Sequence, residues 1–134
     1  MMEQATQLFV WGSLLHLVAD WLLQTEWMTR HKTNLRHPAG WVHGGVHALL
    51  LSAVFPWGAA LAVGVIHVIV DTRVPLRWWL RHYKRLSDGP HRLTVEIWAD
   101  QVLHLVIIAL AALIVADVGA AGANPLTSPG VQGP

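Results

Sequence analysis

Apolar residues gather in four stretches of the chain, at residues 5–29, 39–55, 57–72 and 93–117. As helices rising about 1.5 Å per residue, the first and last stretches are long enough to cross a bilayer. Each middle stretch would be about 25 Å long, near the lower limit for crossing. The helix-breaking sequence Phe55-Pro56-Trp57-Gly58 separates them. The pattern predicts an all-α polytopic membrane protein with four transmembrane helices arranged as two helical hairpins.

The segment that joins the third and fourth stretches is polar on one side and apolar on the other. Its arginines recur every four residues, at Arg73, Arg77, Arg81 and Arg85. Tryptophan and leucine lie between them, which is typical of a helix lying in the membrane interface. We therefore expect a short amphipathic interfacial helix here, with anionic lipid headgroups as partners of its arginines.

The N-terminal end of the chain is expected to be helical and the C-terminal end to be disordered. The N-terminal residues lack the basic start of a signal peptide, so we expect the first apolar stretch to be retained. Residues 119–134 are rich in Gly, Pro, Ala and Ser, which is typical of a disordered tail. A single transmembrane domain is therefore predicted over residues 1–118.

Composition and charge narrow the class of protein and its orientation. Apolar residues make up 54% of the chain and charged residues 13%, and the net charge of +1 argues against nucleic-acid binding. A soluble bundle would need polar outer faces, which residues 48–65 do not offer. All lysines and arginines fall within residues 30–36 and 73–92. The positive-inside rule then predicts that both basic loops are cytoplasmic and both termini are outside.

Each predicted span carries one pair of His or Asp residues four positions apart, on one face of its helix. The pairs are His16–Asp20, His43–His47, His67–Asp71 and Asp100–His104. Because neighbouring helices run in opposite directions, the bundle is expected to sort these side chains into two layers. The outer layer holds His16, His47, His67 and His104, and the inner layer holds Asp20, His43, Asp71 and Asp100.

Such a set of side chains suits a transition metal. Imidazole and carboxylate ligate zinc, iron and manganese, and a cation offsets the cost of burying carboxylates. The chain has no cysteine, which excludes a thiolate site. We predict all eight paired residues as ligands, with zinc favoured, and eight ligands suit two ions better than one. A metal-free proton relay or hydrogen-bond network is the main alternative.

Other polar residues are candidates for supporting roles. His43, Asp100 and Glu96 are candidate general bases: the first two are members of the pairs, and Glu96 lies one turn before Asp100 on the same face. Gln24 and Glu96 could also orient a ligand from one helical turn away. Four further histidines fall in predicted loops and are expected to be solvated: His31, His37, His82 and His91.

The four pairs also carry a resemblance to a known family. The chain resembles a bacterial membrane-protein family catalogued as domain of unknown function 3307. The matching pieces lie between residues 12 and 110 and are His16-Leu-Val-Ala-Asp20-Trp21-Leu-Leu-Gln24, His43-Gly-Gly-Val-His47, His67-Val-Ile-Val-Asp71 and Asp100-Gln101-Val-Leu-His104. The resemblance implies a protein of the bacterial inner membrane. The paired histidines are also similar to those of predicted membrane-bound metal-dependent hydrolases.

Several functions are compatible with this pattern. The leading hypothesis is a membrane-embedded metal-dependent hydrolase acting on a lipid-linked or headgroup ester or phosphoester. Alternatives are a metal-ion or proton transporter, which with four spans would need to form a homodimer, a structural or sensory subunit stapled by metal, and a di-iron redox site. A hydrolase needs an open coordination position beside a cavity, a transporter needs a path to both sides, and a staple needs neither.

Overall fold

The computed structural model describes residues 1–122, and within that range every regular element is helical. The prediction of an all-α fold is therefore confirmed. In chain order the elements are α1 (Met2–Val18), the π-helical segment η1 (Ala19–Leu23), α2 (Glu26–His31), α3 (Pro38–Leu51), α4 (Trp57–Asp71), α5 (Val74–His82) and α6 (Arg92–Gly122). Helix α6 continues to Gly122, beyond the predicted end of the domain at residue 118. The rest of the predicted disordered tail lies outside the described residues.

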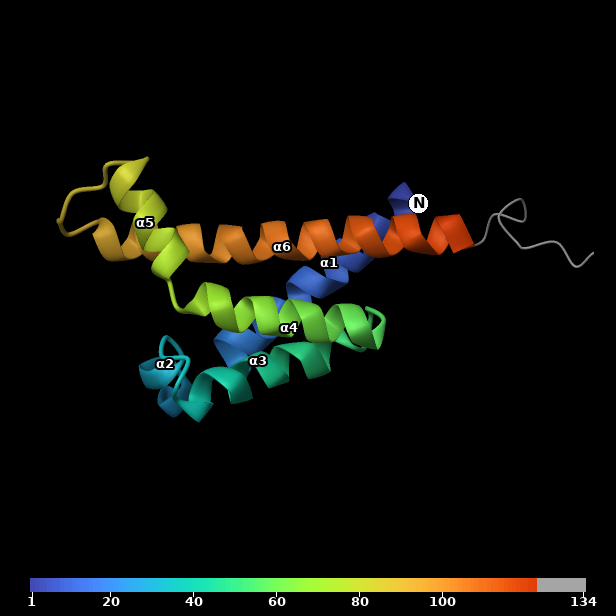
Figure 1. Cartoon of the computed structure of the whole chain (residues 1–134), viewed down its shortest axis with the longest axis horizontal. Helices are drawn as coiled ribbons and strands as arrows, with labels where there is room; N and C mark the ends of the chain where they lie inside the picture. Colours follow the sequence, from blue (N-terminus) through green and yellow to red (C-terminus); the bar gives the residue numbers. More distant parts are fainter. Residues whose placement is uncertain (123–134) are drawn as a thin grey trace, which may run out of the picture.

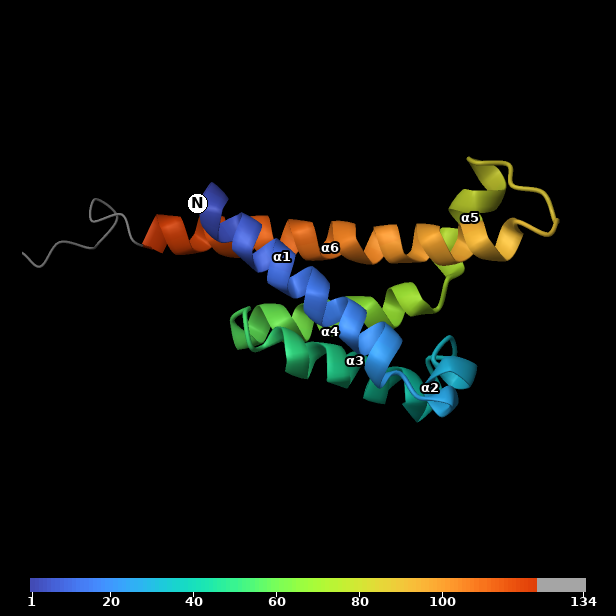
Figure 2. The ribbon, with the colours of Figure 1, turned by 180° about the vertical axis from the view of Figure 1, so that it is seen from behind.

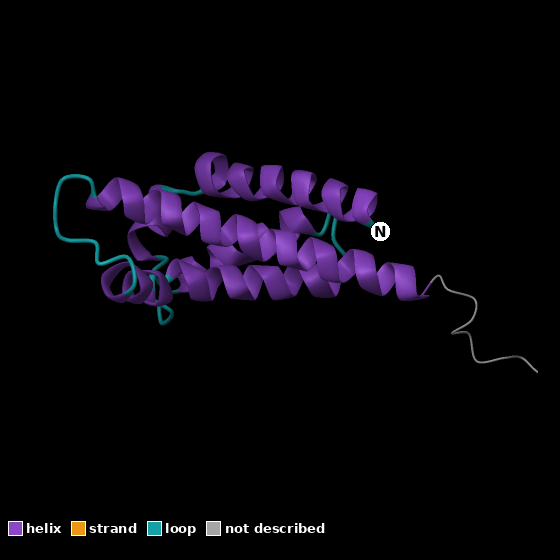
Figure 3. Cartoon of the chain, turned by 90° about the horizontal axis from the view of Figure 1, so that it is seen from above, coloured by secondary structure: helices purple, strands orange, loops and turns teal. Residues whose placement is uncertain are grey.

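Helix α6 runs the length of the molecule, and α5 is steeply inclined to it (Figure 1). Helices α3 and α4 form an antiparallel hairpin beside it, and α1 crosses the other side obliquely (Figure 2). The N-terminus lies near the C-terminal end of α6, whereas α2 and α5 lie at the opposite end of the bundle. Seen from above, the helices form a bundle without a separate second unit (Figure 3). Both basic segments are thus at one end and the turn at Pro56 is at the other.

The number of membrane-crossing helices is smaller than the sequence pattern predicts. Two segments are long and apolar enough to cross, Met2–Leu23 and Arg92–Ala121, and a third is counted if α4 and α5, bent by 53°, are taken together. Helix α3 has 14 residues and α4 has 15. At about 1.5 Å per residue, neither reaches the roughly 30 Å of a hydrocarbon core. The structure thus has two or three candidate spans, and the prediction of four is wrong.

The shortening of α3 has a local cause. Residues 52–55 form a turn instead of continuing the helix, and Pro56 then precedes α4. Ala53, Val54 and Phe55 are apolar, so hydropathy alone extends the helix through them. Phe55 folds inward and is 3% exposed within an apolar core that fills the Pro56 end of the bundle. That core consists of Leu51, Phe55, Ala60, Val63, Ile108 and Ala112.

Two glycines allow α3 and α4 to pack closely. A Cβ atom added to Gly44 would lie 2.2 Å from Cγ2 of Val68 and 2.9 Å from the carbonyl oxygen of Gly64. A Cβ atom on Gly64 would lie 2.8 Å from Cβ of Ala48. Gly45, the neighbour of Gly44, has open space around it. The close approach positions His43 and His47 of α3 against His67 of α4.

Candidate metal centre

The structure brings the eight paired residues into one buried cluster. Each of the four pairs keeps its shared helix face, and those faces turn toward one another between α1, α3, α4 and α6. Each of the eight residues is at most 7% exposed. The cluster consists of His16, Asp20, His43, His47, His67, Asp71, Asp100 and His104.

Asp20 lies at the centre of the cluster because α1 changes its winding there. Residues Ala19–Leu23 form a π-helical segment, whose wider turn redirects side chains and is frequent at functional sites. The Oδ1 atom of Asp20 consequently lies 3.0 Å from Nε2 of His43 and 3.1 Å from Nε2 of His47. It also lies 3.8 Å from Nε2 of His67. One carboxylate oxygen therefore faces three imidazole nitrogens.

Some of these four atoms are spaced as in a metal coordination shell, and others lie somewhat farther apart. Nitrogen or oxygen ligands placed tetrahedrally at 2.0–2.1 Å from zinc are separated from one another by about 3.3–3.4 Å. The Nε2 atoms of His43 and His67 are 3.1 Å apart, and all four ligand atoms lie within 4.8 Å of one another. Asp20, His43, His47 and His67 are therefore close enough to hold a metal ion.

The hydrogen-bond inventory of His43 is consistent with a cation at this place. Its Nε2 atom lies within 3.5 Å of Oδ1 of Asp20, Oδ2 of Asp71 and Nε2 of His67. A neutral imidazole nitrogen carries either one hydrogen or one lone pair. It cannot satisfy two carboxylates and a second imidazole at once, whereas a metal ion would accept lone pairs from all of them.

A second group of potential ligands shares His67 with the first. His67, Asp71 and His104 offer ligand atoms within 4.8 Å of one another. Both carboxylate oxygens of Asp71 and Nε2 of His104 are buried without an aligned hydrogen-bond partner among the described residues. Nδ1–H of His104 donates to the carbonyl oxygen of Asp100 at 2.9 Å, which leaves Nε2 free to act as a ligand. The geometry thus provides one four-residue set and one overlapping three-residue set.

The remaining two members of the cluster lie outside both groups. Nδ1 of His16 is 3.4 Å from Nδ1 of His47, and Nε2 of His16 is 3.6 Å from Oδ2 of Asp20. Oδ2 of Asp100 is 3.9 Å from Nδ1 of His104. Both residues contact candidate ligands, so they are placed to orient those ligands or to exchange protons with them.

Most of the chain matches a model of a known protein family. A family model described as protein of unknown function (DUF3307) matches residues 8–127. The chain belongs to this family. The match includes every member of the buried cluster, as the resemblance of the four pairs predicted. No curated protein and no solved structure matches the chain.

Two residues of this DUF3307 cluster were missed by the sequence analysis. Lys32 is 6% exposed, and its Nζ lies 3.2 Å from Oδ1 of Asp71. Nε2 of Gln101 donates to Oδ2 of Asp20 at 2.9 Å. Gln101 is a polar residue within the apolar stretch 93–117, which was a usable signal. Lys32 lies in a basic loop without periodicity, and its burial had no signal in the sequence.

Two predicted supporting residues of the DUF3307 protein have other partners. Oε1 of Glu96 accepts a hydrogen bond from Nε of Arg77 at 2.5 Å, which joins α6 to α5. Among the described residues, Glu96 lies in neither ligand group. Nε2 of Gln24 donates to Oγ1 of Thr29 at 3.0 Å and so supports the start of α2. These contacts give both residues a local structural role.

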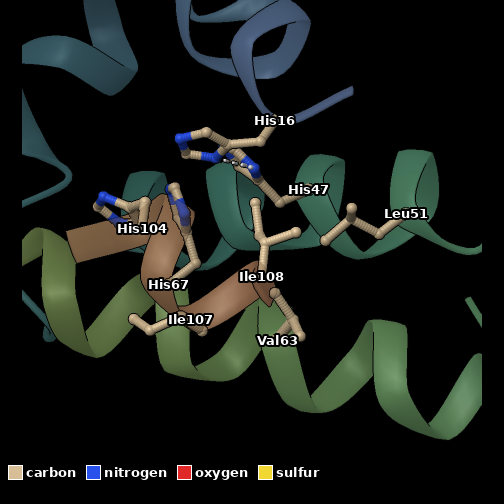
Figure 4. Close-up of a pocket in the computed structure, with 8 residues that line it drawn as sticks. All are labelled: His16, His47, Leu51, Val63, His67, His104, Ile107 and Ile108. Atoms are coloured by element: carbon tan, nitrogen blue, oxygen red, sulfur yellow. Dashed lines mark hydrogen bonds between the residues drawn. The ribbon is translucent and has the colours of Figure 1, made fainter. Parts of the chain in front are cut away.

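A small cavity of about 10 Å³ adjoins the cluster, enough for about one water molecule. The four imidazoles assigned to the outer layer line one side of it (Figure 4): His16, His47, His67 and His104. The other side is apolar and consists of Leu51, Val63, Ile107 and Ile108. In this DUF3307 protein the polar cluster thus ends at the apolar core, on the side away from the basic segments.

Proposed function

We propose that this protein is a membrane-embedded metal-dependent hydrolase that acts on an ester or phosphoester in a lipid headgroup or lipid-linked substrate. The observation that carries the proposal is the convergence of Oδ1 of Asp20 with the Nε2 atoms of three histidines at metal-ligand spacing. The ligand set without sulfur favours zinc, with iron or manganese as alternatives. Membership of the family indicates no activity, and the proposal therefore rests on this geometry.

The position of the cluster suits a substrate at the membrane surface. Asp71 is the last residue of α4, and Asp20 lies in η1 at the end of α1. Both are therefore near the end of the bundle that carries the basic segments. By the positive-inside rule we assign that end to the cytoplasmic side of a bacterial inner membrane, with both termini outside. An ester or phosphoester at the headgroup level would reach the buried site once the α2 side opens, because the cavity beside the cluster holds only about one water molecule.

The roles within the site follow from the contacts. Asp20, His43, His47 and His67 would supply the ligands, and with three of them bound to the ion a position would stay open for a water molecule, which the ion would make more acidic while polarising the scissile bond. His43 was also a candidate base, but its place among the ligand atoms favours the ligand role. Glu96 is engaged by Arg77. Asp100 therefore remains as the proton acceptor, acting beside His104.

Replacing Asp100 by asparagine tests this assignment. The variant should retain the metal, because Asp100 lies outside both ligand groups among the described residues. Its hydrolytic rate should fall by about 10²–10⁴-fold, the usual contribution of a general base. The measurement is product release from mixed micelles of anionic phospholipid, followed by mass spectrometry, with metal content determined on the same samples. If the Asp100→Asn variant hydrolyses substrate at the wild-type rate, Asp100 is not the general base.

The same assay separates hydrolysis from the other candidate functions. A transporter would need a polar path to both ends of the bundle, and the apolar core around Leu51, Phe55 and Ile108 argues against one. A protein that holds stoichiometric metal but releases no product from ester or phosphoester lipids would be a structural or sensory subunit. That outcome would contradict the hydrolase proposal and leave metal binding intact.

A further inference from the structure

Lys32 places an ammonium group inside the cluster of candidate ligands. Its Nζ atom lies 3.2 Å from Oδ1 of Asp71, 3.8 Å from Oδ1 of Asp20 and 3.4 Å from Nε2 of His43. A buried ammonium is costly unless charged or polar partners compensate it. These carboxylates provide that compensation, and in return Lys32 offsets their negative charge. Without a metal, Lys32 therefore does part of what a metal ion would do.

An ammonium and a divalent ion cannot both use these atoms. The oxygen of Asp20 and the nitrogen of His43 that face Nζ are the same atoms that belong to the four-residue ligand set. Two cations held against one carboxylate repel each other, and the repulsion is strong where water is excluded. A bound metal ion should therefore displace the ammonium of Lys32 from the cluster.

The segment that carries Lys32 is placed to move with it. Helix α2 has six residues, and Met28 is its buried residue. Residues 33–36, which follow Lys32, are exposed. One close contact has to separate when the segment opens, because the Lys32 carbonyl oxygen lies against α3, 3.0 Å from where a Cβ atom on Gly40 would be. A short segment with one buried apolar anchor opens more readily than the packed helices beneath it.

The opposite side of the cluster offers no comparable entry. The cavity there has a volume of about 10 Å³ and is backed by Leu51, Val63 and Ile108. An ion would have to cross that apolar core to arrive from the Pro56 end of the bundle. The α2 side, where Lys32 contacts the ligands, is the polar approach to the site within the described residues.

We propose that Lys32 is a tethered cation that occupies the metal site of the ion-free protein, and that it leaves with the segment from Thr25 to His37 when a divalent ion enters from the α2 side. This inference rests on the proposed metal binding. It adds the route by which the ion enters the site. It also identifies Lys32 as an intramolecular competitor that lowers the affinity of the site for the ion. Metal binding and burial of Lys32 are then mutually exclusive.

Amine labelling tests the proposal, because the chain has two lysines, Lys32 and Lys84, and Lys84 is exposed. Purified full-length protein in mild detergent is treated with a water-soluble amine reagent, with and without zinc, and the lysine peptides are quantified. Without zinc, Lys32 should react at least ten times more slowly than Lys84. With zinc bound, the Lys32 rate should rise at least tenfold while the Lys84 rate is unchanged. Continued protection of Lys32 in zinc-loaded protein would overturn the proposal.

A variant gives an independent second readout. Lys32→Met keeps the length of the side chain and removes its charge, so the zinc affinity should rise at least tenfold in a chelator competition. Arg36→Met, at an exposed position of the same segment, is the matched control and should leave the affinity unchanged. A folded Lys32→Met variant with equal or weaker zinc affinity would overturn the competition. If the wild-type protein binds no zinc, iron or manganese, the proposed function itself fails, which the same titration reveals.

Discussion

Replacing Asp20 by asparagine is expected to lower the affinity of the protein for a divalent metal ion by about 100-fold or more. Even residues that only support a ligand typically contribute 10–100-fold, and Asp20 is placed as a ligand itself. Among the carboxylate oxygens of residues 1–122, its Oδ1 atom is the one for which the structure shows contacts with His43, His47 and His67 together. Asparagine keeps the shape but removes the negative charge that attracts the ion. Chelator competition with zinc in mild detergent measures the change.

The control for Asp20 is a carboxylate elsewhere in the same bundle. Asp117 is exposed near the C-terminal end of α6, far along the chain from the cluster residues of that helix. Asp117→Asn makes the same chemical change and should leave the affinity for zinc unchanged. If Asp20→Asn binds zinc as the wild type does, the four-residue ligand set assigned above is incorrect.

Replacing Gly44 by alanine is expected to lower the free energy of unfolding by about 1–3 kcal/mol, the usual cost of overpacking an interior contact. The added methyl group would lie 2.2 Å from Cγ2 of Val68 and 2.9 Å from the carbonyl oxygen of Gly64. The side chain of Val68 can shift, but the backbone of α4 at Gly64 cannot move without separating the two helices. Thermal unfolding in detergent, followed by circular dichroism, measures the loss.

The neighbouring glycine provides a matched control. Gly45 lies on the same helix one position later, and a Cβ atom added there meets nothing within 4 Å. Because alanine favours the helix over glycine by up to about 1 kcal/mol, Gly45→Ala should be neutral or stabilising. Equal destabilisation by both substitutions would mean that the close approach of α3 to α4 is not what Gly44 provides.

The buried cluster is the part of the structure that the sequence predicted best. A helix fixes the relative direction of side chains four positions apart, so each pair, such as His67 and Asp71, could be assigned to one face without knowing the fold. Polar groups on apolar helices must then face one another to be compensated. These two constraints were enough to predict that the pairs meet, because neither depends on loop geometry.

The parts that the sequence did not predict depend on local backbone geometry. The π-helical turn that aims Asp20 leaves no periodic signal, because it is a deviation of a few residues from the α-helix. Lys32 reaches the cluster from an irregular segment whose course no hydrophobic pattern fixes. The turn at residues 52–55 is apolar, so hydropathy alone cannot distinguish it from a helix. This extension of the helix led to the prediction of four spans. Contacts made by turns and loops thus had to come from the structure.

Metal analysis of protein purified in mild detergent tests the central claim most directly, with a His47→Ala, Asp71→Ala double variant measured alongside. The two substitutions remove one ligand from each candidate group. We expect near-stoichiometric zinc, iron or manganese in the wild-type protein and its loss in the folded double variant. A wild-type protein that carries no metal, and gains none when zinc, iron or manganese is added, would contradict the account, and the buried histidines and aspartates would then form a proton relay or a packing network.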